Sequence, residues 1–294
     1  MSREFNLNLR KFDLNMIQDD SMVVAIGRRR TGKSIVIKDL MFQNRDIPFG
    51  NVISGTEEAN QFYGDFVPKT YIYNKYSHDI ILNIIKRQKE MIGMVNSGNP
   101  QYKKIDPRLF LILDDCLFDD RWTRDIGIRS CFMNGRHWKV MFLITMQYPL
   151  GIPPALRTNI DYTIIMREMY MSNRKRIYEH YAGCFPTFDM FCQVMNSLGE
   201  FECLIVSNNA ASNKLEDQVF WYKANLHDDF KVGSKAYWKY HQENYNPDER
   251  EQFDVSSYRS SSKIINIQKE DHAEDNSNRN FYNPDNNETE FYER

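Results

Sequence analysis

The stretch MVVAIGRRRTGKSIVIKDL, residues 22–40, decides the fold. It begins with an apolar run, residues 22–26, whose β-branched side chains predict a strand buried on both faces. The run ends at Gly27, and residues 27–34 match the phosphate-loop pattern G-x-x-x-x-G-K-[ST]. Apolar residues at near-helical spacing follow Ser34, so the loop lies between a strand and a helix. This context predicts a site for a nucleoside triphosphate.

The phosphate loop needs these residue types for a physical reason. Glycines let the backbone turn its N–H groups toward phosphate oxygens, and the helix that follows adds its N-terminal partial positive charge. Lys33 is expected to reach the β- and γ-phosphates, and the Ser34 hydroxyl is expected to ligate Mg²⁺. The residues expected to bind the nucleotide are those of the whole loop: Gly27, Arg28, Arg29, Arg30, Thr31, Gly32, Lys33 and Ser34.

A second informative stretch is LFLILDD, residues 109–115. Its continuous apolar run predicts a buried strand, and its two carboxylates fall at the C-terminal end, where parallel α/β sheets bind their ligands. This is the Walker B pattern. Asp114 is expected to support Mg²⁺, and Asp115 is expected to act as the general base on the attacking water. Acids commonly end strands, so the pattern gains its weight from the phosphate loop upstream.

Strands alternate with helices along the chain, which predicts an α/β fold: a P-loop NTPase with a largely parallel central sheet flanked by helices. Further strands are expected at 51–54, 70–73, 140–146, 162–166, 204–206 and 219–222. Helices are expected from Ser77 onward and over 121–138, 152–157, 172–181 and 187–198. The expected domains are an N-terminal lead-in (1–21), a P-loop ATPase domain (22–225) and an acidic, polar, mobile C-terminal tail (226–294) that lacks apolar periodicity.

Composition sets broader limits. The net charge of −2 neither favours nor excludes a nucleic-acid partner, and 294 residues suffice for a sizeable core. The N-terminus has no apolar signal segment and no apolar run approaches ~18 residues, so we expect a soluble, non-secreted protein without a transmembrane segment. The five cysteines include no CxxC pair, and we expect reduced structural thiols rather than a metal site or disulfides.

With these motifs in view, the chain resembles the DNA-packaging ATPases of nucleocytoplasmic large DNA viruses, in the FtsK–HerA branch of the ASCE P-loop ATPases. The resemblance covers about residues 20–225. Its motifs occur in family order: GRRRTGKS (27–34), LFLILDD (109–115), FMNGRHW (132–138), VMFLITMQYP (140–149) and ALRTNIDYTIIMRE (155–168). Bacterial relatives usually end the Walker B strand in Asp-Glu, whereas this chain has Asp114-Asp115.

The resemblance implies a homo-oligomeric ring that uses ATP to thread double-stranded DNA, without sequence preference, into a preformed capsid. It also implies that the strand ending in Gln147 lies between the two Walker strands and senses the γ-phosphate. One subunit's arginine would complete the neighbour's site: Arg157 is the first choice, with Arg174 second and Arg28 as a candidate in cis. The implied catalytic residues are thus Lys33, Asp115, Gln147 and Arg157.

The same resemblance implies partners and a location. The partner would be a capsid protein or a capsid-associated membrane protein, and the location would be the viral assembly site in the host-cell cytoplasm, or the virion. No DNA-reading motif is visible, and a translocase that grips phosphates needs none. Basic groups at Lys103-Lys104 and at Arg174-Lys175-Arg176 are candidates for DNA contact.

Two other interpretations remain open. The first is a P-loop nucleoside or nucleotide kinase, or another P-loop NTPase that does not act on DNA; such kinases lack the Asp-Asp strand followed by a Gln-ended strand and carry an Arg-rich lid. The second is a non-catalytic scaffold that only binds nucleotide, which is disfavoured because every catalytic position is filled. DNA-stimulated hydrolysis separates a translocase from a kinase.

Overall fold

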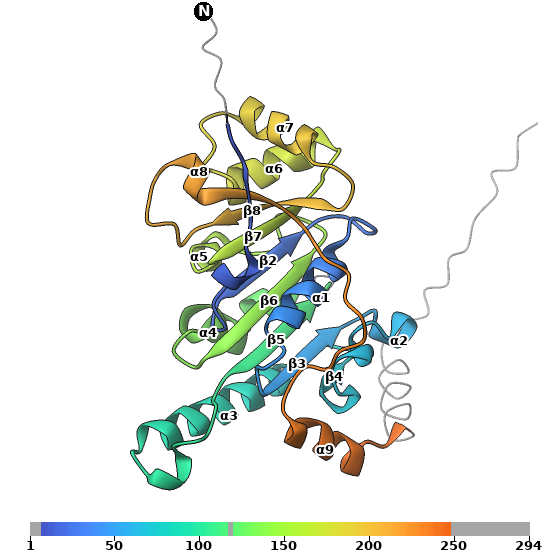
Figure 1. Cartoon of the computed structure of the whole chain (residues 1–294), viewed down its shortest axis with the longest axis vertical. Coiled ribbons are helices and arrows are strands. Elements are labelled where there is room, and N and C mark those ends of the chain that lie inside the picture. The colour runs from blue at the N-terminus through green and yellow to red at the C-terminus, as the bar shows by residue number, and fades with distance from the viewer. Residues whose placement is uncertain (1–6, 117–119, 248–294) are drawn as a thin grey trace, which may run out of the picture. The chain divides into compact units, whose positions relative to one another are not determined.

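One mostly parallel sheet organises the described residues, 7–116 and 120–247, of the computed structural model (Figure 1). Within them, nine strands lie in the order β1-β9-β8-β7-β2-β6-β5-β3-β4. Neighbouring strands are parallel except where β8 meets β7 and β9. The strands are β1 (Arg10–Lys11), β2 (Met22–Ile26), β3 (Phe49–Ser54), β4 (Ile72–Tyr73), β5 (Leu109–Asp114), β6 (Val140–Met146), β7 (Tyr162–Met166), β8 (Glu202–Ser207) and β9 (Val219–Lys223).

Helices connect the strands and cover both faces of the sheet. The α-helices are α1 (Lys33–Gln43), α2 (Glu57–Asn60), α3 (His78–Asn96), α4 (Ile126–Asn134), α5 (Pro154–Arg157), α6 (Met171–Tyr181), α7 (Phe188–Ser197), α8 (Leu215–Gln218) and α9 (Lys235–Asn244). Short 3-10 helices lie at η1 (Leu14–Met16), η2 (Tyr63–Asp65), η3 (Lys69–Tyr71), η4 (Pro100–Tyr102) and η5 (Asp120–Arg124). Among the described helices, none combines the length and the apolar character needed to cross a membrane.

Two hydrophobic cores lie on opposite faces of the sheet. Successive residues of β2 alternate between them, because side chains along a strand point to opposite faces. Helices α3, α4, α6 and α7 pack into the core that holds Val24, while α1 and α9 pack into the core that holds Val23. Each residue of β2 is at most 5% exposed. The predicted α/β architecture, its largely parallel sheet and its β2 strand are therefore confirmed.

The strand order confirms a further expectation. β6, which ends one residue before Gln147, lies between β2 and β5 and pairs in parallel with both. The phosphate-loop strand and the Walker B strand are therefore not neighbours, and the predicted sensor strand separates them.

The helix expected over 121–138 is shorter than predicted. The structure has the 3-10 helix η5 up to Arg124 and then α4, which begins only at Ile126. Asp125 sets this start, because its Oδ1 accepts hydrogen bonds from the backbone N–H groups of Gly127 and Ile128 and so caps the helix. The expected strand at 70–73 is likewise reduced to β4, since η3 occupies its first half.

The C-terminal boundary expected at residue 225 is wrong. Residues 226–245 belong to the same compact unit as the sheet. Val232 is fully buried and Tyr237, on α9, is 3% exposed; the Tyr237 hydroxyl donates to the Gly50 carbonyl of β3 at 2.6 Å. The segment is held by a few widely spaced aromatic and apolar side chains, which produce no helical period in the sequence. The remainder of the predicted tail, 248–294, and the start of the lead-in, 1–6, lie outside the described residues.

Tyr237 provides a test of this docking. Replacing it by alanine should lower the free energy of unfolding by about 3–5 kcal/mol, because a buried ring is lost and the Gly50 carbonyl loses its donor. Tyr240→Ala on the same helix, at a side chain 51% exposed, is the control and should change stability by no more than about 0.5 kcal/mol. Urea unfolding measures both values, and equal small effects would contradict the docked position of α9.

Candidate functional site

Three polar residues lie side by side at the carboxyl edge of the sheet. Ser54 ends β3, Asp114 ends β5 and Thr145 is the penultimate residue of β6; the register pairs Asp114 with both neighbours. The end of β2, from which the phosphate loop leaves, lies beside the end of β6 in the same register. Because the carboxyl ends of parallel strands share one edge, the strand order brings both predicted motifs together there.

Glycines shape the phosphate loop between β2 and α1. Gly32 has a φ of 98°, in the left-handed region that side chains disfavour. A Cβ on Gly27 would lie 2.5 Å from the Cβ of Met166, the last residue of β7, so only glycine lets the loop pass this strand. Within the loop, Thr31 Oγ1 donates to the Arg28 carbonyl at 2.7 Å and braces the turn.

Lys33 begins α1 and folds its ammonium group back onto the loop. Its Nζ donates to the carbonyl oxygens of Gly27 and, at 3.0 Å, of Arg28. Burial lowers the pKa of Lys33, while the charges of Asp114 and Asp115 act in the opposite direction. The ammonium group is therefore partly desolvated inside the loop, which strengthens its attraction for an anion that enters there.

Asp114 is almost fully buried, and hydroxyl groups flank its carboxylate. Thr145 Oγ1 donates to Oδ1, and Ser54 Oγ donates to Oδ2 at 3.2 Å. Burial raises the pKa of this carboxyl above its usual range, although the two hydrogen bonds and Lys33 favour its ionised form. Two hydroxyls use only part of the accepting capacity of a carboxylate, so Asp114 retains lone pairs for a further ligand.

Asp115 leaves the strand in a bent conformation. Its φ is 54°, which aspartate tolerates better than most residues. Its backbone N–H donates to Thr145 Oγ1 at 3.2 Å, and its Oδ2 accepts from Gln147 Nε2. Thr145 thus bonds to both acids, and Gln147 bonds directly to the second. The predicted base and the predicted sensor are joined in the structure.

A cavity of about 610 Å³ opens at this edge. It gathers most of the residues that the sequence singled out: Arg28, Arg29, Arg30, Gly32, Lys33, Ser34, Asp114, Asp115 and Gln147. Gly27 and Thr31 are not among the described lining residues; Gly27 is buried beneath the loop. The lining also includes Ile35, Thr56, Asn60 and Phe201, which were not predicted from the sequence to belong to the site.

Thr145 and Ser54, which donate hydrogen bonds to Asp114, were not among the site residues predicted from the sequence. A signal for Thr145 was present, because it is the one polar residue in the buried strand VMFLITM. Ser54 ends a strand in the same way as Asp114 does. Their contact with Asp114 depends on the pairing of β3, β5 and β6, which single-chain periodicity does not reveal.

The three arginines considered as fingers differ in their surroundings. Arg174 is buried, and its guanidinium donates to the Glu168 carbonyl at 2.6 Å and to Asn196 Oδ1 at 2.8 Å, so it serves the packing of α6 and is excluded as a finger. Arg28 lies over the Tyr170 ring, 4.7 Å from its centroid, with Glu168 also 3.5 Å away.

Arg157 ends α5 and is absent from the described lining of the cavity. Its guanidinium lies over the ring of Tyr181, 5.6 Å from the centroid. Within one copy of the chain, therefore, Arg157 has no direct place at the phosphate loop.

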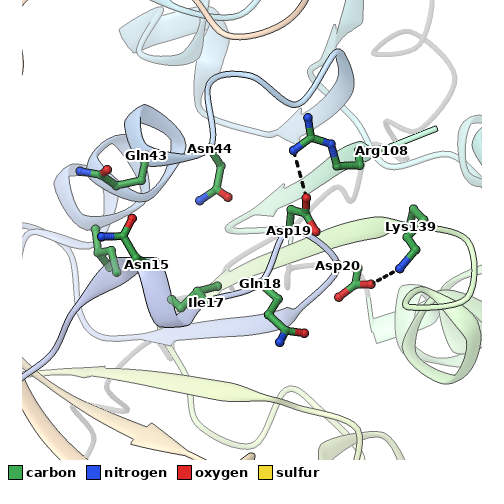
Figure 2. Close-up of a pocket in the computed structure, with 10 residues that line it drawn as sticks. Asn15, Ile17, Gln18, Asp19, Asp20, Gln43, Asn44, Arg108 and Lys139 are labelled. Atoms are coloured by element: carbon green, nitrogen blue, oxygen red, sulfur yellow. Dashed lines mark hydrogen bonds and ion pairs between the residues drawn. The ribbon is translucent and has the colours of Figure 1, made fainter. Parts of the chain in front are cut away.

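A second cavity of about 400 Å³ lies where β2, β5 and β6 begin, at the opposite edge of the sheet (Figure 2). Its two cations are already paired with acids. Arg108 donates to Asp19 at 3.0 Å, as well as to Asp46 and Asp106, and Lys139 donates to Asp20 at 2.8 Å. With these charges satisfied internally, the cavity is a poor site for a polyphosphate, and the cavity beside Lys33 is the candidate site.

Replacing Asp114 by asparagine tests its buried charge. Since the folded-state pKa of Asp114 is raised, the folded chain holds the proton more tightly than the unfolded chain, and ionisation costs stability as pH rises above the unfolded-state pKa. Asp114→Asn should therefore raise the melting temperature of the ligand-free chain at pH 7, by roughly 2–4 °C for each kcal/mol gained. The gain over the parent should shrink as the pH is lowered.

Thermal unfolding at several pH values measures this difference. Asp228→Asn, at an exposed carboxylate, is the control and should leave the melting temperature unchanged at every pH. A lower melting temperature for Asp114→Asn at pH 7 would mean that the carboxylate stabilises the fold through its hydroxyl partners.

Comparisons with known proteins point to viral relatives. Uncharacterized protein L437 of Acanthamoeba polyphaga mimivirus is 36% identical over 242 residues, which cover 82% of this chain and 85% of the relative. Uncharacterized protein 075L of Invertebrate iridescent virus 6 is 36% identical over 260 residues, covering 84% of this chain and 98% of the relative. No family model matches the chain.

Solved structures give more distant likenesses. The genome packaging NTPase B204 from Sulfolobus turreted icosahedral virus 2, in complex with AMPPCP, is 17% identical with a TM-score of 0.48 and covers 71% of this chain and 100% of that one. EssC (ATPases 2 and 3) from Geobacillus thermodenitrificans is 15% identical with a TM-score of 0.47, and the match covers 81% of this chain and 45% of the EssC chain. Because the chain is 36% identical in sequence to both L437 and 075L, it belongs to their family of nucleocytoplasmic large DNA virus proteins. This is the viral group that the resemblance of its motifs indicated.

Proposed function

We propose that the chain is an ATP-hydrolysing translocase that packages double-stranded viral DNA into the capsid. One observation carries the ATPase part: Lys33 of the phosphate loop and both Walker B acids line the same cavity, together with Gln147. The DNA-packaging part rests on the order of the motifs and on the family's occurrence in large DNA viruses. The proposed place of action is the viral assembly site in the host-cell cytoplasm.

The residues at the cavity fit a Mg²⁺ ion bound together with the nucleotide. Asp114 is a buried carboxylate with a raised pKa, and a nearby divalent cation would stabilise its ionised form. Ser34 lines the same cavity from the first turn of α1. Ser34 and Asp114 would hold the ion, which would neutralise charge on the β- and γ-phosphates when bound.

The chain's own residues divide the work of hydrolysis. Lys33 offsets negative charge on the β- and γ-phosphates. Asp115 takes a proton from water as the water oxygen bonds to the γ-phosphorus and the bond from that phosphorus to the β-phosphate oxygen breaks. Gln147, hydrogen-bonded to Asp115, orients this carboxylate and responds to the γ-phosphate. When the γ-phosphate is lost, a change in the Gln147–Asp115 hydrogen bond would therefore be transmitted to β6, which Gln147 directly follows.

The proposed motor is a homo-oligomeric ring that contacts the phosphate backbone of DNA. Of the basic candidates, Arg174 is buried and engaged with Glu168 and Asn196, so it drops out. Lys103 and Lys104, beside η4, are exposed, as is Lys175 on α6. Together with Arg176, which is partly buried and lies over the Tyr148 ring, these three lysines are our candidates for DNA contact, and contacts of this kind would be weakened by salt. The proposed partner of the ring is a capsid protein or a capsid-associated membrane protein.

Lys33→Ala tests the ATPase proposal. The phosphates would lose the lysine cation at the base of the loop, so ATP turnover should fall to background and ATP binding should weaken. Lys239→Ala, at an exposed lysine on α9, is the matched control and should turn over ATP like the parent. A coupled phosphate-release assay with and without double-stranded DNA measures both variants.

The same assay tests the role of DNA. Turnover by the parent should rise when double-stranded DNA is added, irrespective of its sequence. Phosphate transfer to a nucleoside or nucleotide, with no response to DNA, would favour the kinase instead. Normal turnover by Lys33→Ala would rule out the phosphate-loop assignment altogether.

The ring is tested by mixing two inactive variants. If Arg157 acts on the neighbouring subunit, Arg157→Ala should fold and bind ATP like the parent but hydrolyse it slower by on the order of a thousandfold or more. Mixed with Lys33→Ala, it should regain turnover, because a subunit with an intact Lys33 can receive an intact Arg157 from its neighbour. Absence of recovery in confirmed mixed assemblies would exclude Arg157 as a shared residue and leave Arg28, in cis, as the candidate.

A further inference from the structure

Phe201 is an aromatic residue with an unusual backbone conformation. Its φ is 60°, in the left-handed region where a bulky residue is an outlier, and the residue is 52% exposed. Among the described non-glycine residues, five have a positive φ, and three of them, Arg30, Asp115 and Phe201, line the candidate cavity. Backbone conformations of this kind persist where the surrounding structure enforces them, and they gather at functional sites.

The topology explains how Phe201 reaches the phosphate loop. β8 runs antiparallel to β7, with Cys203 opposite Met166, so the turn that precedes β8 lies at the edge where β7 ends. Glu202 closes this turn, since its Oε2 accepts from the Gly199 N–H at 2.7 Å. The Phe201 ring then stands beside the loop: its Cδ1 would lie 3.3 Å from a Cβ built on Gly32.

Most of the side chains that line the cavity are polar. Among the described lining residues, Ile35 and Phe201 are the only ones with apolar side chains. The others apart from Gly32 carry charges, hydroxyls or amides, including the lysine and the two acids assigned to the phosphates and Mg²⁺. A nucleoside triphosphate has the same division, because a charged polyphosphate is joined through a sugar to a flat base with apolar faces.

We propose that Phe201 is the platform on which the nucleobase stacks; Ile35 is the other apolar side chain of the described lining. The assignment rests on the proposed nucleotide site, because it uses the phosphate position at Lys33 to locate the base. Stacking on a ring engages the face of the base, which all bases share, rather than its hydrogen-bonding edge. Phe201 therefore distinguishes a nucleotide from a bare polyphosphate and contributes little to the choice between bases.

Titration of the full chain with two ligands in the presence of Mg²⁺ tests the platform. ATP has a base and inorganic tripolyphosphate has none, so Phe201→Ala should weaken ATP binding by about tenfold to a hundredfold and leave tripolyphosphate binding within about twofold of the parent. Phe201→Tyr, which keeps the ring, should bind ATP like the parent. GTP and CTP should lose affinity in Phe201→Ala as ATP does.

Control variants separate this role from others. Met169→Ala, at a side chain 67% exposed in the neighbouring β7–α6 connection, is the matched control and should not change either affinity. Phe201→Gly tolerates the positive φ without strain and should unfold at a temperature no lower than Phe201→Ala, while sharing its loss of ATP affinity. Isothermal titration calorimetry and thermal unfolding provide these values.

The outcomes are distinguishable. Equal losses for ATP and tripolyphosphate would mean that Phe201 merely supports the phosphate loop, and an unchanged affinity for ATP would mean that the base does not stack on Phe201; either result overturns the platform. If ATP binds the parent and Lys33→Ala abolishes that binding, the nucleotide site stands whatever Phe201 does. A parent that binds neither ligand would overturn the proposed function and the platform together.

Discussion

Asp114 ends a strand that is buried along its whole length, so its carboxylate lies where charge is costly. Hydroxyl groups of Thr145 and Ser54 offset part of that cost, and both are supplied by neighbouring strands in register. The rest of the site depends on this alignment of Ser54, Asp114 and Thr145. The same Thr145 hydroxyl accepts the backbone N–H of Asp115, and Asp115 in turn bonds to Gln147. A one-residue shift in the pairing of β5 with β6 would separate Asp114 and Asp115 from Thr145 and Gln147.

The site also keeps its opposite charges apart. Among the described residues, no ion pair joins Lys33 to either acid, and the lysine ammonium bonds to the Gly27 and Arg28 carbonyls instead. Desolvation has opposite effects on the two pKa values, lowering that of Lys33 and raising that of Asp114. Both shifts reflect charge that lacks full compensation. A polyphosphate and a divalent cation would supply the missing charge of each sign, which is the physical basis of the proposed function.

The sequence predicted the parts of this site that are local and left out those that depend on pairing between distant segments. The phosphate loop and the Walker B acids lie within short motifs whose chemistry can be read residue by residue, and the alternation of strands and helices predicted the sheet. Thr145 lies next to these motifs only because β6 lies between β2 and β5. Phe201 lies next to them only because β8 runs antiparallel to β7. α9 was not predicted, because few of its side chains pack against the sheet and so produce no helical period. Tyr237 is its buried residue. The proposed finger Arg157 would act on a second copy of the chain, which the sequence of one copy does not describe.

The central claim is that a triphosphate and Mg²⁺ bind at the carboxyl edge of β2, β5 and β6. A crystal structure of the chain with a non-hydrolysable ATP analogue and Mg²⁺ tests it most directly. We expect the Lys33 ammonium group to leave the Gly27 and Arg28 carbonyls and to contact the phosphates, with the metal ion on the side of Ser34 and Asp114. Phosphates bound instead in the second cavity, between Arg108 and Lys139, or Lys33 still bonded to the loop carbonyls beside a bound nucleotide, would contradict the account.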